Sequence, residues 1–87
     1  MKSVEMTVTH EVGLHARPAA LFVQTSQKYK AGIKVTYKGK TVNAKSLLGL
    51  LSLGVTKDAL IEITADGIDE ADALDKLTSL VKNNFGE

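Results

Sequence analysis

Apolar and polar residues alternate in four stretches of the chain, and a period of two is typical of β-strands with one buried face. The stretches cover residues 4–8, 33–37, 40–44 and 59–65. Lys38 and Gly39 separate the second stretch from the third. A two-residue connection that contains glycine indicates a tight hairpin turn between the strands. The pattern therefore predicts four strands, two of which form a hairpin.

Residues 19–30 repeat apolar positions with the spacing of an α-helix. One side of this helix is expected to hold Ala19, Phe22, Val23 and Ser26. Gly32 follows the stretch and is expected to terminate the helix. A second helix is expected after Asp69, whose side chain should cap it. The buried side of that helix is expected to hold Ala71, Leu74, Leu77, Val81 and Phe85.

A short apolar segment lies between these two helices, and Ser46 and Gly54 are its expected first and last boundaries. Five leucines occur within seven residues of this segment, namely Leu47, Leu48, Leu50, Leu51 and Leu53. Five leucines cover more of a two-turn helix than one buried side can hold. Some of them therefore either remain exposed as a protein-docking patch or are buried on both sides of a wedged helix.

The elements follow the order β-α-β-β-α-β-α, and the 87 residues are enough for one domain with one core, residues 1–87. Elements in this order can bury their apolar faces in one core when the helices pack on one face of a four-stranded sheet. We expect an α+β open-faced sandwich, in which three helices cover one face of an antiparallel sheet.

Charge is unevenly distributed, although the net charge is only +1. Residues 12–57 contain eight cationic side chains and no Asp or Glu, whereas residues 58–87 contain eight acids and two lysines. The basic half indicates either an anionic ligand or acidic partner, or a solvated surface. The chain has no cysteine, and it has no apolar run near the ~20 residues of a membrane helix. We expect a cytoplasmic protein without a secretory leader, membrane insertion, cofactor or metal site.

The segment GLHARPAA, residues 13–20, places a histidine and an arginine where the first helix begins. The N–H groups of Ala16 and Arg17 are expected to lie near the His15 ring, at the partly positive end of the helix. Pro18 is tolerated in this first turn. An anion would meet backbone donors and a guanidinium there, so His15 could accept a phosphoryl group that Arg17 steadies. The alternative interpretation is that His15 is a loop residue near the helix end, that Arg17 is a solvated charge, and that neither has a chemical role.

The segments GLHARPAALFVQ and VNAKSLLGLLSLGV resemble the active-centre and regulatory-serine motifs of the HPr family, and the resemblance covers essentially the whole chain. HPr proteins are phosphocarriers of the phosphoenolpyruvate-dependent sugar phosphotransferase system. The resemblance implies that His15 accepts a phosphoryl group through Nδ1 from enzyme I and passes it to enzyme IIA domains, with Arg17 as the active-centre arginine. Such a carrier is not a turnover enzyme.

The same resemblance implies that Ser46 is phosphorylated by an HPr kinase/phosphorylase, and that the product binds a catabolite-control transcription factor. It also implies a partner-docking surface, which comprises Ala20, Gln24, Leu47, Leu48 and Leu51. Enteric HPr proteins tend to have lysines on this surface, where this chain has Gln24, Gln27 and Gly49. The chain is therefore more similar to the Gram-positive branch.

Two other functions are compatible with parts of the sequence. The regulatory paralogue Crh has similar segments, but glutamine replaces its active-centre histidine, whereas this chain retains His15. A Crh-like module would act only through Ser46. The basic middle of the chain is compatible with nucleic-acid binding, but that function would leave the cluster of His15, Arg17 and Pro18 unused, so no direct nucleic-acid contact is expected.

Overall fold

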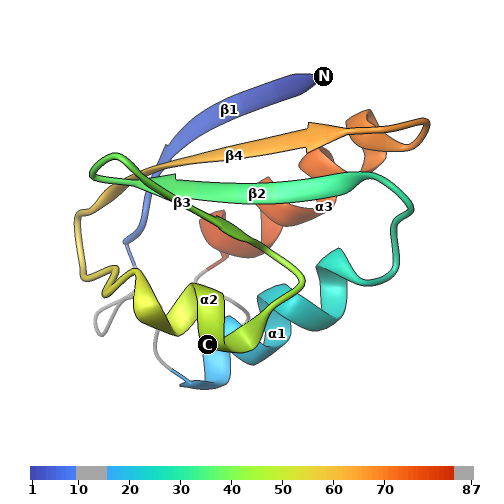
Figure 1. Ribbon diagram of the computed structural model, residues 1–87. Coiled ribbons are helices and arrows are strands. Elements are labelled where there is room, and N and C mark those ends of the chain that lie inside the picture. The colour runs from blue at the N-terminus through green and yellow to red at the C-terminus, as the bar shows by residue number, and fades with distance from the viewer. Residues whose placement is uncertain (10–15, 84–87) are drawn as a thin grey trace.

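The computed structural model describes residues 1–9 and 16–83. The strands are β1 (Lys2–Thr7), β2 (Gly32–Tyr37), β3 (Lys40–Asn43) and β4 (Leu60–Asp66). The helices are α1 (Ala16–Ser26), α2 (Leu47–Ser52) and α3 (Glu70–Lys82). The sheet forms one layer, and the three helices lie together on one side of it (Figure 1). This arrangement is the α+β open-faced sandwich that the sequence predicts. Within the described ranges, no helix has the length and apolar character needed to cross a membrane.

All strand pairs are antiparallel, and the strand order across the sheet is β1-β4-β2-β3. β4 therefore lies inside the sheet, although it is the last strand in the chain. The register places Ile63 of β4 opposite Val4 of β1 on one side and Val35 of β2 on the other. Side chains in one such row project to the same face of a sheet. The row packs into the core with the helices, where Ile63 and Val35 are fully buried.

The core joins alternate strand residues to one stripe of each long helix. In α1 the predicted stripe is confirmed, because Ala19, Phe22, Val23 and Ser26 are all buried. In α3 the prediction for Ala71 is wrong: Ala71 is exposed and Ala73 is buried in its place. At ~100° per residue, Ala71 and Ala73 lie on opposite sides of the face that Leu74, Leu77 and Val81 share, and the packing of α3 against the sheet buries the side of Ala73. Phe85 lies outside the described residues.

The end of α1 differs from the prediction. The helix ends at Ser26, and the N–H groups of Lys28 and Tyr29 then donate to carbonyls three residues earlier, at 3.2 Å each. Such tighter turns commonly end an α-helix. Gly32 is therefore not the helix terminator and instead begins β2.

The predicted hairpin is confirmed, since Lys38 and Gly39 both have positive φ, 51° and 81°, as a tight two-residue turn between strands requires.

Asp69 immediately precedes α3, as predicted, but among the described residues its carboxylate does not cap that helix. The two carboxylate oxygens instead accept from the backbone N–H groups of Lys30 and Ala31, each at 2.8 Å. Gly67, two residues before Asp69, lies against the same turn, because a Cβ on Gly67 would stand only 2.6 Å from the Ala31 Cα. The turn of residues 29–31, called the 29–31 turn below, is thus locked to the turn that precedes α3.

Candidate functional site

The start of α1 brings an exposed cation to a helix N-terminus. α1 begins at Ala16, so Arg17 and Pro18 lie in its first turn. Arg17 is exposed, whereas Pro18 and Ala19 are buried and hold this end of the helix in the core. The first N–H groups of a helix give that end a partial positive charge. The guanidinium and the helix end therefore favour a bound anion at the same place. His15 precedes Ala16 in the sequence and lies outside the described residues.

Ser46 is the N-cap of α2, which confirms the boundary predicted from the sequence. Its backbone is extended, with φ −113° and ψ 114°, and its Oγ accepts from the N–H of Gly49 at 3.1 Å. The residue is half-buried. A Cβ at Gly49 would approach Ser46 Oγ to 3.3 Å and the Val42 Cβ to 3.4 Å. A glycine at this position therefore allows α2 to pack closely beside the capping serine.

The five leucines of the α2 segment divide between the core and solvent. Leu50 and Leu53 are buried, with 0% and 8% of their surfaces exposed. Leu47, Leu48 and Leu51 are exposed to 39%, 80% and 37%. We call these three residues the α2 leucine face. The excess of leucines therefore does mark exposed apolar surface, and large exposed apolar patches are typical of interaction sites.

α1 packs against α2, so the two helices lie side by side (Figure 1). On α1, Ala20 is half-buried and Gln24 is exposed. These two residues are four apart, so they lie on the same side of the helix. At the other end of α2, Lys40 Nζ donates to the Ser52 carbonyl at 3.3 Å. A cation near a helix C-terminus is electrostatically favourable.

The sequence did not indicate a contact that connects Lys45, just before Ser46, to the 29–31 turn that follows α1. Lys45 Nζ donates to the backbone carbonyl of Tyr29 at 2.8 Å. The pKa of Asp69 is lowered chiefly by the hydrogen bond from the Lys30 N–H, and the positive charge of Lys45 makes a smaller contribution. The contact joins residues 16 positions apart. No local pattern of the sequence could have indicated it.

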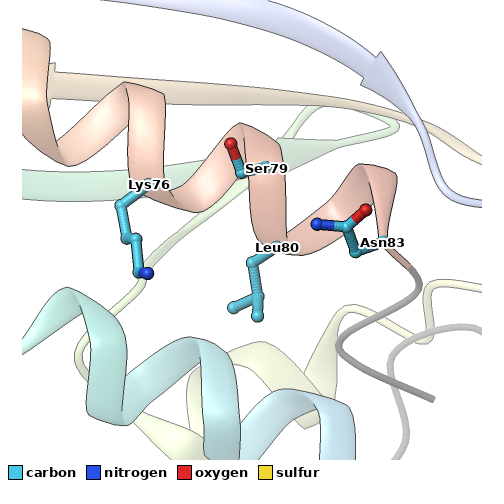
Figure 2. A pocket seen from close by; sticks show the side chains of 4 residues that line it. All are labelled: Lys76, Ser79, Leu80 and Asn83. Atoms are coloured by element: carbon cyan, nitrogen blue, oxygen red, sulfur yellow. The ribbon is translucent and has the colours of Figure 1, made fainter.

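A hollow of about 140 Å³ lies on α3 and is lined by Lys76, Ser79, Leu80 and Asn83. Figure 2 shows Leu80 pointing away from α3 towards α1. None of the predicted site residues that the structure describes lines this hollow.

Comparison with known proteins gives consistent results. The model of the family described as "PTS HPr component phosphorylation site" matches residues 2–83. The structure is similar to HPr-C-His from Thermoanaerobacter tengcongensis, with 46% identity, a TM-score of 0.97, and coverage of 100% of this chain and 98% of that chain.

Two Bacillus proteins are also similar. The phosphocarrier protein HPr from Bacillus anthracis has 42% identity and a TM-score of 0.89, with coverage of 92% of this chain and 95% of that chain. Crh, the catabolite repression protein of Bacillus subtilis, has 40% identity and a TM-score of 0.77, with coverage of 97% of each chain. Because the family match spans nearly the whole chain, the protein belongs to the HPr family of phosphocarrier proteins.

Proposed function

We propose that this protein is the phosphoryl carrier of a bacterial phosphoenolpyruvate-dependent sugar phosphotransferase system, acting in the cytoplasm. His15 accepts the phosphoryl group from enzyme I and passes it to sugar-specific enzyme IIA domains. The family match over residues 2–83 is the observation that supports this proposal most strongly. When enzyme I donates, the bond between phosphorus and the His15 Nδ1 forms while the bond from phosphorus to enzyme I breaks. When enzyme IIA accepts, the phosphorus–Nδ1 bond breaks while the bond from phosphorus to enzyme IIA forms. The chain is a reactant that is regenerated, not a turnover enzyme.

In this proposal the start of α1 stabilises the transferred group. Arg17 is exposed in the first helical turn, where its guanidinium can approach a phosphate. The N–H groups of Ala16 and Arg17 belong to the positive end of the helix. Arg17 and these N–H groups together favour the negative charge of the phosphoryl oxygens, and Pro18 in the same turn is buried.

The α2 leucine face is the proposed docking surface for enzyme I and enzyme IIA, together with Ala20 and Gln24 on α1. Its exposed apolar area supports this role, because docking would remove Leu48 from water without disturbing the buried Leu50. All charged residues between positions 12 and 57 are cationic. A partner with an apolar centre and carboxylates around it therefore complements this surface.

Ser46 is the proposed regulatory site, modified by an HPr kinase/phosphorylase and then recognised by a catabolite-control transcription factor. A phosphate on Ser46 would stand at the N-terminus of α2, where negative charge is favourable. Its oxygens could replace Oγ as acceptors for the Gly49 N–H. The modification would then change the charge of the docking surface while α2 remains folded.

Phosphorus NMR tests this proposal directly. After incubation with phosphoenolpyruvate and enzyme I, the wild-type protein and Ser46→Ala should show a phosphohistidine signal, and His15→Ala should show none. Incubation with ATP and the kinase should give phosphoserine in His15→Ala but not in Ser46→Ala. A wild-type protein that acquires phosphoserine but never phosphohistidine would be a Crh-like regulator, and the carrier proposal would be rejected.

A further inference from the structure

Three contacts from two parts of the chain converge on the 29–31 turn. The Tyr29 carbonyl accepts from Lys45 Nζ, while the N–H groups of Lys30 and Ala31 donate to the Asp69 carboxylate. All three distances are 2.8 Å. A cation and an anion therefore bind consecutive backbone groups of one turn. Because Asp69 and Gly67 fix this turn against the start of α3, it is a rigid anchoring point for Lys45.

The loop between Lys45 and α2 is itself braced, so that a constraint on Lys45 also acts on Ser46. The Asn43 Oδ1 accepts from the Lys45 N–H at 2.9 Å, and the Asn43 carbonyl accepts from the Ser46 N–H at 3.1 Å. Ser46 in turn holds the first turn of α2. Its Oγ accepts from Gly49 and its carbonyl accepts from the N–H of Leu50, each at 3.1 Å.

α2 requires such external anchoring because it is only six residues long and Leu50 is its one buried residue. Helices this short are not stable by themselves. Hydrogen bonds in which the donor is charged are among the stronger ones. The partly buried bond from Lys45 to Tyr29 connects the segment before α2 to the 29–31 turn, which follows α1, the other helix of the proposed docking surface.

We propose that Lys45 is a positioning residue, which holds Ser46 and the α2 leucine face in place relative to α1 through its bond to the Tyr29 carbonyl. It acts through the backbone of the 29–31 turn and not by touching the transferred phosphoryl group. Its importance for phosphoryl transfer rests on the proposed function, whereas its effect on α2 belongs to the isolated protein.

The first test is hydrogen exchange of the isolated protein, observed by NMR at the amides of Gly49 and Leu50. Both amides donate to Ser46 and therefore report its position. Lys45→Met retains the aliphatic stem but removes the donor, and it should accelerate exchange at these amides by roughly tenfold or more. The amide of Ile63, in the middle of β4, should change much less. Lys45→Arg should restore slow exchange, because it retains a charged donor.

Lys57→Met is the matched control, since it removes the same charge from an exposed position in the loop between α2 and β4. It should leave the exchange of Gly49 and Leu50 unchanged. If Lys45→Met behaves like this control, or accelerates all amides equally, Lys45 is not a positioning residue. If Lys45→Met does not fold, Lys45→Gln replaces it in the same comparison, because glutamine is too short to span the contact.

The second test measures phosphoryl transfer from enzyme I at several concentrations of each variant. Lys45→Met should raise KM several-fold with little change in kcat, Lys45→Arg should recover most of the loss, and Lys57→Met should resemble the wild type. A higher KM without faster exchange at Gly49 and Leu50 would mean that Lys45 contacts the partner directly, and would overturn the proposal. If the wild type accepts no phosphoryl group, the proposed function fails, while the exchange result still decides whether Lys45 positions α2.

Discussion

Replacement of Gly67 by alanine should strongly destabilise the protein, because the new methyl group has no space. An ideal Cβ at Gly67 would lie 2.6 Å from the Ala31 Cα and 3.0 Å from the Ala31 Cβ. Carbon atoms pack favourably at about 3.5–4.0 Å. One of the two turns must therefore move by about 1 Å. The nearest atom belongs to the backbone, so no side-chain rotation can relieve the overlap.

The movement also affects Asp69, which follows Gly67 by two residues. A shift of about 1 Å would lengthen its 2.8 Å bonds to Lys30 and Ala31 beyond the usual hydrogen-bond range of about 3.2 Å. Overpacking typically costs about 1–3 kcal/mol. We expect Gly67→Ala to lie at the upper end, with a loss of about 3 kcal/mol in the free energy of unfolding. For a chain of this size, that corresponds to a Tm lower by about 12–24 °C.

Two other glycines provide matched controls in urea unfolding followed by circular dichroism. A Cβ at Gly32 would meet only the Asp66 carbonyl at 3.9 Å, so Gly32→Ala should change stability by less than about 0.5 kcal/mol. Gly54 has φ +66° and open space around it, so Gly54→Ala should cost about 1 kcal/mol through backbone strain alone. If Gly67→Ala is as stable as Gly32→Ala, the close approach to Ala31 does not constrain this fold.

Three further outcomes are expected. Ser26→Ala should be neutral or stabilising by up to about 1 kcal/mol in urea unfolding, because the buried Ser26 Oγ has no hydrogen-bond partner among the described residues; a marked loss of stability would contradict this. The hydrogen bonds from Lys30 and Ala31 lower the pKa of Asp69, so this carboxylate stabilises the fold above its ordinary pKa, and the contribution disappears as pH falls through the lowered value. Asp69→Asn should therefore reduce the loss of stability between pH 7 and pH 2, and an identical pH dependence in both proteins would refute this. Leu50→Ala should cost about 2–5 kcal/mol, whereas Leu48→Ala should leave stability nearly unchanged and raise KM for enzyme I; equal losses of stability would refute the division between core and docking surface.

The sequence predicted those features of the fold that depend on local periodicity. Alternation located the four strands. The excess of leucines around α2 left open whether the additional leucines are exposed or buried on both sides of the helix, and the fold leaves three of them exposed. The prediction for Ala71 failed because residues 71–74 contain three apolar side chains, and the packing of α3 against the sheet decides which of them are buried. Spacing alone cannot indicate the exact rotation of a helix.

Other features depend on partners that are distant in the sequence. Asp69 has the residue type and position of an N-cap, yet its carboxylate binds N–H groups 38 and 39 residues away. Lys45 is one of several lysines in a basic segment, and only the fold places the Tyr29 carbonyl within its reach. At the candidate site, the residues around His15 are compatible with phosphate binding on physical grounds, but the resemblance to HPr proteins was needed to single them out.

The position of β4 inside the sheet has a consequence for synthesis on the ribosome. Residues 60–66 must leave the exit tunnel before β1 or β2 can find a partner on that side, since both strands pair with β4. Until then, the β2–β3 hairpin is the only strand pairing of the described sheet that can form. Pairing of β1 with β4 joins segments more than fifty residues apart, and such non-local contacts slow folding. The nascent chain must therefore keep its first strand unpaired until the last strand emerges.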